Sequence, residues 1–189
     1  MIARRTALLA GFGALAGCAI TPAPVVTLPF DPAMGFADPA RQAIIHTAHF
    51  FAAPGSMAGQ SWIAAQAISE AEYLTVELNF AQRWIEMSPI VKAAFQRARP
   101  EWRAALGIDQ AAQPQAVINA LTAVRYAYGA QDAAAAAAAL RPPLFTPGGP
   151  ATIAILSALP PLPQAAWAAM MAQNEMWRIQ VQDSRDNWE

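Results

Sequence analysis

The feature that most constrains the fold is a long apolar repeat between residues 56 and 87. Apolar side chains recur there at the three- and four-residue intervals of one helix face. They are Ile63, Ala67, Leu74, Leu78, Ala81 and Ile85, and the stripe is widened by Trp62, Tyr73, Phe80 and Trp84. A helix over residues 61–87 would be roughly 40 Å long and would span a domain. The repeat predicts one long central helix.

The polar residues of the same stretch fill the remaining positions; they are Glu70, Glu72, Glu77, Gln82 and Glu86. A wide apolar face with polar flanks is typical of the central helix of a bundle. We therefore expect Leu74, Leu78 and Trp84 to lie in the core. Glu72 is expected on the surface, so that Glu72→Ala should be near neutral.

Proline, glycine and capping residues divide the rest of the chain into further helices. Asp38-Pro39 begins a helix that ends near Ala53, with Asp38 as the cap. Other starts are Ser88-Pro89, Gln113-Pro114, Asp132 before the seven alanines of residues 133–139, Pro150 and Leu162-Pro163. No strand pattern is seen. The sequence predicts an all-α fold, a helical bundle of about five to seven helices around the long central one.

The segment after Ser88 carries the most basic charge, from Lys92, Arg97, Arg99 and Arg103. Pro100 is expected to break or kink its helix, and a short turn then ends at Gly107. A charge run of this kind is usually a solvated face. The alternative is that it pairs with the acidic face of the long helix.

The N-terminus ends in Leu15-Ala16-Gly17-Cys18, which places the only cysteine after a Leu-Ala-Gly triplet. Arg4 and Arg5 precede an apolar run at residues 6–14, which is too short to span a bilayer. These residues resemble the lipobox signal of a bacterial lipoprotein. The resemblance implies export, cleavage before Cys18, and a membrane anchor through lipid, such as palmitate, on Cys18.

Other interpretations of the N-terminus stay open. Ala14-Leu15-Ala16 also fits an ordinary A-x-A cleavage site. Arg4-Arg5 fits either a plain charged n-region or a twin-arginine export signal. In lipoproteins of this type an Asp after the cysteine often signals retention at the inner membrane, so Ala19 favours the outer membrane, with the domain in the periplasm.

The chain divides into a signal peptide at residues 1–17, a Pro-rich tether at 18–36 and a single all-α domain at 37–189. Prolines at 22, 24, 29 and 32 make the tether semi-rigid. Its apolar residues Val25, Val26, Leu28 and Phe30 indicate that part of it lies along the domain, while its length lets the domain stand off the membrane. The net charge is −1, or −3 without Arg4 and Arg5. Neither value indicates a nucleic-acid partner.

Few residues suggest chemistry. His46 and His49 lie three apart on one predicted helix face, which is the spacing of a weak metal site with Glu70 or Glu77 as further ligands. The paired Glu-x-x-His motifs of a di-iron bundle are absent. Gly55-Ser56-Met57-Ala58-Gly59 lacks the spacing of a nucleophile elbow. We therefore expect a protein without enzymatic activity and without a cofactor.

Two features suggest a partner instead. Six tryptophans are present; core or rim positions are their default, but tryptophan is also enriched at interfaces. One face of the last predicted helix carries Trp167, Met170, Asn174, Trp177 and Val181, which is an assignment of helical periodicity and not of a role. The rigid loop at residues 141–150 carries Leu144 and Phe145, which either dock a partner or fold back into a gap between helices.

These observations predict a membrane-anchored envelope lipoprotein, a non-enzymatic structural or accessory protein that binds a protein partner. The alternative is a ligand- or metal-binding helical bundle in the periplasm. An enzyme of unrecognised type is the third possibility. No family resemblance is found for the mature domain.

Overall fold

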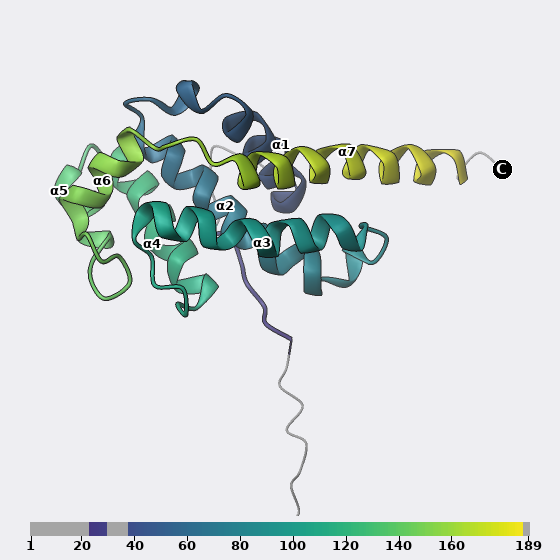
Figure 1. Ribbon diagram of the computed structural model, residues 1–189, viewed down its shortest axis with the longest axis horizontal. Helices are drawn as coiled ribbons and strands as arrows, with labels where there is room; N and C mark the ends of the chain where they lie inside the picture. The colour runs from purple at the N-terminus through teal and green to yellow at the C-terminus, as the bar shows by residue number, and fades with distance from the viewer. Residues whose placement is uncertain (1–22, 30–37, 187–189) are drawn as a thin grey trace, which may run out of the picture.

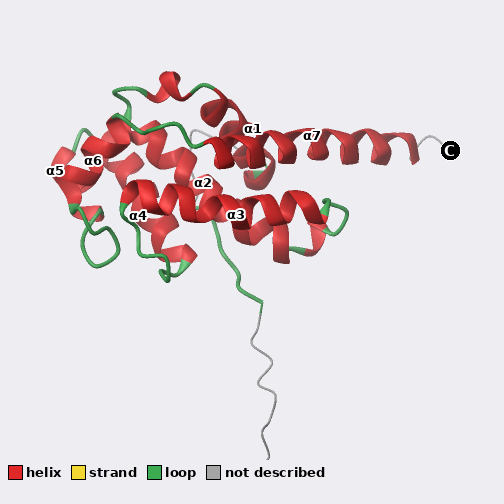
Figure 2. Cartoon of the chain, in the orientation of Figure 1, coloured by secondary structure: helices red, strands yellow, loops and turns green. Residues whose placement is uncertain are grey.

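The computed structural model describes residues 23–29 and 38–186 of the chain (Figure 1). This part of the chain contains α-helices and no β-strand (Figure 2), which confirms the predicted all-α class. The α-helices are α1 Pro39–Ala52, α2 Ser61–Phe80, α3 Pro89–Leu106, α4 Pro114–Gly129, α5 Ala133–Ala139, α6 Gly149–Ser157 and α7 Pro163–Asp186. Short 3₁₀ helices, η2 (Pro54–Met57) and η3 (Gln82–Trp84), flank α2.

Helix α2 is the centre of the bundle, as the apolar repeat predicts. It contacts α1, α3, α4 and α6, and Leu74 and Leu78 on it are fully buried. The helix ends at Phe80, however, so the predicted extension to residue 87 is wrong. Ala81 is extended, and η3 folds back so that the Arg83 Nε and the Trp84 Nε1 donate to Glu77 Oε1 at 2.7 and 3.3 Å. Trp84 is buried as expected.

The expected surface position of Glu72 is also wrong, because Glu72 is fully buried. Its carboxylate accepts hydrogen bonds from Arg99 Nε at 2.8 Å, from Trp102 Nε1 at 2.8 Å and from the Nε and Nη2 of Arg103. Arg99 and Arg103 of the basic segment therefore pair with the long helix, as the alternative describes, whereas Arg97 is exposed as on a solvated face. A buried carboxylate is tolerated here because four side-chain nitrogen atoms donate to it.

Arg103 extends this ion pair into the following loop. Its side chain is fully buried, and its Nη1 donates to the carbonyl oxygens of Asp109, Gln110 and Ala112, each at 3.0 Å. The turn between α3 and α4 is thus fixed to α2 through one guanidinium group.

Helix α3 continues through Pro100 instead of breaking there, which corrects the predicted interruption. A proline inside a helix removes one backbone donor and crowds the preceding turn. Buried side chains on both sides of it, Phe95 before and Trp102 after, keep the two halves on the core. The helix ends at Gly107, which is left-handed with φ of 62°, as predicted.

The predicted helix starts are confirmed where caps are visible. Asp38 accepts from Ala40 N, Ser88 from Ile90 N and Asp132 from Ala135 N. The alanine helix α5 also allows the close packing expected of it. A Cβ on Gly149, at the start of α6, would lie 2.1 Å from the carbonyl oxygen of Ala137.

Helix α7 closes the bundle by packing against α1 and α3 (Figure 1). The side that it buries is made of small residues and one methionine: Ala165, Ala168, Ala169, Ala172 and Met176. Because this alanine face is buried, the side chains on the opposite face of α7 are exposed.

Candidate partner-binding site

The outer face of α7 is the most prominent apolar surface in the described part of the chain. We call it the α7 stripe, and its members are Trp167, Met170, Trp177 and Val181, with Asn174 between them. The four apolar side chains are 46%, 49%, 47% and 51% exposed, and Asn174 is exposed as well. Helical periodicity predicts that these residues share one face, but it does not predict that this face is exposed.

Alanines on the opposite side explain this orientation. Small side chains let two helix axes approach closely, which favours burying the alanine face against α1 and α3. The larger residues are then left in solvent. Trp84 and Trp102 follow the default for tryptophan and are buried. A continuous alanine face opposite a tryptophan face is the signal that sequence reasoning missed.

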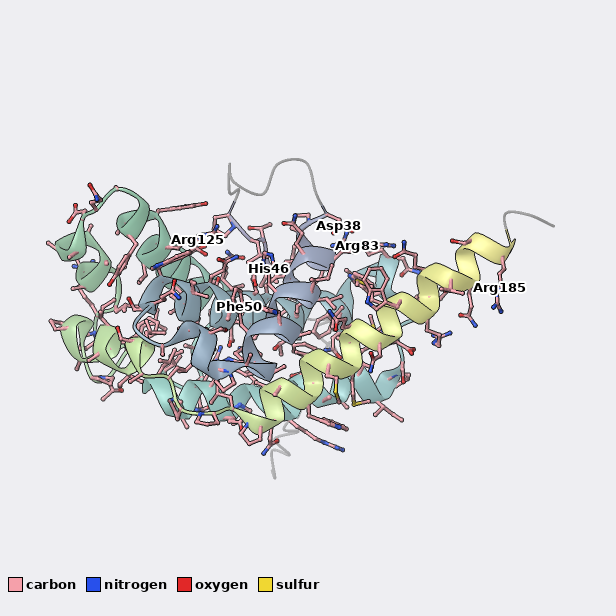
Figure 3. The ribbon with its side chains drawn as sticks, turned by 90° about the horizontal axis from the view of Figure 1, so that it is seen from above. Asp38, His46, Phe50, Arg83, Arg125 and Arg185 are labelled. Atoms are coloured by element: carbon pink, nitrogen blue, oxygen red, sulfur yellow. The ribbon has the colours of Figure 1, made fainter. Side chains whose placement is uncertain are left out.

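The C-terminal end of α7 continues past the other helices (Figure 1). Met176 is the last buried residue among those of α7 whose burial is described, and Arg185 lies clear of the bundle in Figure 3. Two polar links join this region to its neighbours: Arg41 Nη1 donates to Gln180 at 3.3 Å, and Arg178 Nη2 donates to the Glu86 carbonyl at 3.4 Å. Arg178 also pairs with Glu175, with Nε and Oε2 2.8 Å apart.

Residues 23–29 form an extended strap that lies against α4. Gln115 pairs with the backbone of Thr27, accepting from its N at 2.8 Å and donating to its O at 2.9 Å. Val26 is buried and Leu28 packs on the core, while Val25 is exposed. The expectation that part of the tether lies along the domain is confirmed. Residues 23–29 are held on α4, and the α7 stripe remains exposed beside them.

Phe145 is fully buried. It forms an isolated antiparallel bridge with Ile108, and Leu144 packs partly on the same core. This is the packing that the fold-back alternative describes, since a docking residue must be accessible to its partner. The loop at residues 141–150 therefore offers no exposed Phe145 for docking.

His46 and His49 do not converge on one point. The Nδ1 atom of His46, which is labelled in Figure 3, lies 3.1 Å from Glu70 Oε1. His49 is instead exposed and packs edge-on against Phe50. In the described residues, no three His, Cys, Asp or Glu side chains form a group that could hold a metal ion. His46 and Glu70 lie side by side, and together they would supply at most two of the ligands that a metal ion requires.

Glu70 lies in a second buried polar cluster on α2. Gln66 Nε2 donates to its Oε1 at 2.8 Å, while its Oε2 is buried without a hydrogen-bond partner. Burial raises the pKa of this carboxyl group, and the His46 hydrogen bond and charge, Gln66 and the charge of Arg125 oppose that shift only in part. Glu70 therefore favours its protonated form more than an exposed glutamate does.

A small open cleft of about 290 Å³ lies between the start of α1, the η3 turn and α7; its lining includes Asp38, Arg41, Arg83, Ile85 and Ile179. Its arginines already have partners. Arg83 Nη1 is 2.9 Å from Asp38 Oδ1, and Arg41 Nε is 3.7 Å from Asp38 Oδ2. With its cations paired internally, the cleft offers little charge for a ligand.

Comparisons with known proteins do not assign the chain: no family model matches it, and neither curated proteins nor solved structures give a significant match. Cys18 and the rest of the lipobox lie outside the described residues. Within residues 23–29 and 38–186, no helix is both long and apolar enough to cross a membrane.

Proposed function

We propose that this protein is a lipid-anchored envelope protein that carries no catalytic activity and binds a protein partner through the α7 stripe. The anchor is supported by Leu15-Ala16-Gly17-Cys18, with Cys18 as the lipidated residue. Ala19 after Cys18 favours the outer membrane, with the helical domain in the periplasm.

The observation that carries the binding role is the exposure of two tryptophans, a methionine and a valine along one helix face. Contiguous apolar patches on soluble proteins mark interaction sites. Tryptophan and methionine are also enriched in the central part of interfaces. Leu144 and Phe145, the residues suggested by the sequence, are replaced in this proposal by Trp167, Met170, Trp177 and Val181.

The strap limits how far the domain stands from the membrane. Seven residues lie between Cys18 and the buried Val26, and an extended chain covers at most about 3.3–3.6 Å per residue, so the eight steps from Cys18 to Val26 span roughly 27 Å. The whole tether of residues 18–36 would reach further. A lipid on Cys18 would therefore keep the strap, which is held by Gln115 and the core, within roughly 27 Å of the membrane surface.

A ligand- or metal-binding bundle is the second candidate function. It is favoured by one observation, the buried and unpartnered Oε2 of Glu70 beside His46. Metal analysis of the purified chain tests it, with His46→Ala as the matched variant. Metal retained by the native chain and lost by His46→Ala would support this function over the proposed one.

Cys18→Ala tests the anchor. We expect this variant to leave the membrane fraction and to lack the mass of the lipid, while its circular dichroism stays helical. The unsubstituted chain should stay in the membrane pellet after a high-salt wash, which separates lipid anchoring from electrostatic adsorption. Equal membrane association and equal mass in both proteins would refute the lipid anchor.

A further inference from the structure

The α7 stripe has the spacing of a coiled-coil seam. From Trp167 its positions are Met170, Asn174, Trp177, Val181 and Ser184, so intervals of three and four alternate without interruption. Such alternation keeps one narrow seam directed at a single partner helix. The described side chains of this seam are exposed along the whole length of α7.

We propose that the occupant of this seam is a second copy of the chain, with the two α7 helices antiparallel. The inference rests on the proposed function, since it names the partner of the same site. An antiparallel pair aligns each a position with a d position of the other helix. The layers become Trp167 against Ser184, Met170 against Val181, and Asn174 against Trp177.

This register is self-complementary in size and in hydrogen bonding. The largest side chain of the seam, Trp167, faces one of the smallest, Ser184, and Met170 meets an apolar residue. The Asn174 side chain faces an indole N–H, which needs an acceptor once it is buried. A parallel pair would instead stack Trp167 on Trp167 and Trp177 on Trp177, with like-sized bulky residues in two layers.

The charges beside the seam are compatible with a twofold pair. The flanking residues near its centre are Met171, Gln173, Arg178 and Gln180. In the antiparallel register Gln173 meets Gln180, and Arg178 meets Met171. Arg178 already pairs with Glu175 of its own helix, so association brings no unpaired like charges together.

The overhanging end of α7 gives a second, independent reason. Its side chains at residues 180–182, 184 and 185 are exposed, and a short helical end without packing is marginal in water. In the antiparallel pair, each overhang lies along Trp167 and Met170 of the other copy. The overhanging end of α7 in each copy thus covers Trp167 and Met170 of the other copy, and the two contacts form a closed twofold interface.

Cysteine cross-linking of the full chain in its own envelope tests this proposal. Met170→Cys and Val181→Cys are made separately, given tags of different size, and expressed singly or together with Cys18 unchanged. We expect a mixed disulfide dimer under mild oxidation only when both variants are present. A homodimer of Met170→Cys alone would overturn the antiparallel register, and a cross-link only to a different protein would overturn the second copy while leaving the proposed function intact.

Mass measurement of the detergent-solubilised chain provides the companion test. Static light scattering, corrected for detergent, should give twice the mass of the chain for the native protein and a single mass for Met170→Glu. Tyr128→Glu is the matched control, because Tyr128 is 39% exposed but lies on α4; it should remain dimeric. A native monomer that also yields no mixed disulfide would refute the dimer. If Met170→Glu then lost binding to vesicles made from the lipids of the same envelope, the occupant of the seam would be a lipid surface.

Discussion

Helices α2 and α7 place their polar and apolar residues in opposite ways. Helix α2 buries two glutamates, Glu70 and Glu72, in the middle of the bundle. Helix α7 buries mainly alanines and leaves Trp167 and Trp177 nearly half exposed. The same chain therefore buries carboxylates in one helix and exposes tryptophans in another, although hydropathy alone predicts the reverse.

The contrast shows that partners, and not polarity alone, decide burial. Glu72 is buried because Arg99, Trp102 and Arg103 all donate to it. Trp177 is exposed because the alanine side of α7 already fills the space between α1 and α3. Burial of a carboxylate costs little free energy when the carboxylate is paired. An exposed tryptophan either forgoes the free energy of burying its apolar surface or lies in an interface.

The largest effect is expected at Glu72. Glu72→Ala leaves the fully buried Arg103 guanidinium without its carboxylate, and breaking one side of a buried ion pair costs about 3–5 kcal/mol. Urea denaturation should show this fall in the free energy of unfolding. Glu86→Ala is the matched control, because Glu86 is exposed. Equal midpoints for Glu72→Ala and the native chain would mean that this ion pair does not stabilise the fold.

A somewhat smaller effect is expected from an apolar loss in α2. Leu78 is fully buried, so Leu78→Ala should lower the free energy of unfolding by about 2–5 kcal/mol. Ile85→Ala should change it by less than about 0.5 kcal/mol, because Ile85 is 68% exposed. Thermal melting of both variants checks the pair. An unchanged midpoint in Leu78→Ala would contradict the central position of α2.

Much of the fold follows from local signals in the sequence. Asp38, Ser88 and Asp132 cap helices because their side-chain oxygens meet free backbone N–H groups, and this depends on neighbouring residues only. The apolar repeat likewise identifies α2 as the central helix. The end of α2 at Phe80 was missed, because Arg83 and Trp84 are turned back by Glu77, a contact that helical periodicity does not encode.

The candidate site was harder to predict, because exposure depends on long-range packing. Pairing of Glu72 with Arg103 joins residues from α2 and α3, and the sequence could offer it only as an alternative. Trp167 and Trp177 were recognised as sharing a face, but only the packing of α7 on α1 and α3 shows which face is outside. For Phe145 the sequence left docking and folding back as alternatives, and only the packed structure shows that the proline-rich loop folds it inward.

The smallest effect is expected at Glu70, and it depends on pH. Burial raises the pKa of Glu70 in the folded protein above its ordinary value of 4.5. The folded state then binds more protons than the unfolded state between these two pKa values. By linkage, the stabilising contribution of Glu70 is complete below the unfolded pKa and is lost as the pH rises through the folded pKa.

Glu70→Gln removes this titration while keeping the size of the side chain. We expect the variant to match the native chain near pH 4 and to be the more stable of the two at neutral pH, because the unfolded carboxyl group releases its proton more readily than the buried one. The difference between the two pH profiles reports Glu70 together with its hydrogen-bonded neighbour His46, which loses the facing carboxylate in the variant. Urea denaturation from pH 4 to 8 measures that difference, with Glu86→Gln as an exposed control. A flat difference for Glu70→Gln would show that burial does not raise this pKa, because the hydrogen bonds and charges of His46, Gln66 and Arg125 would then balance the effect of burial.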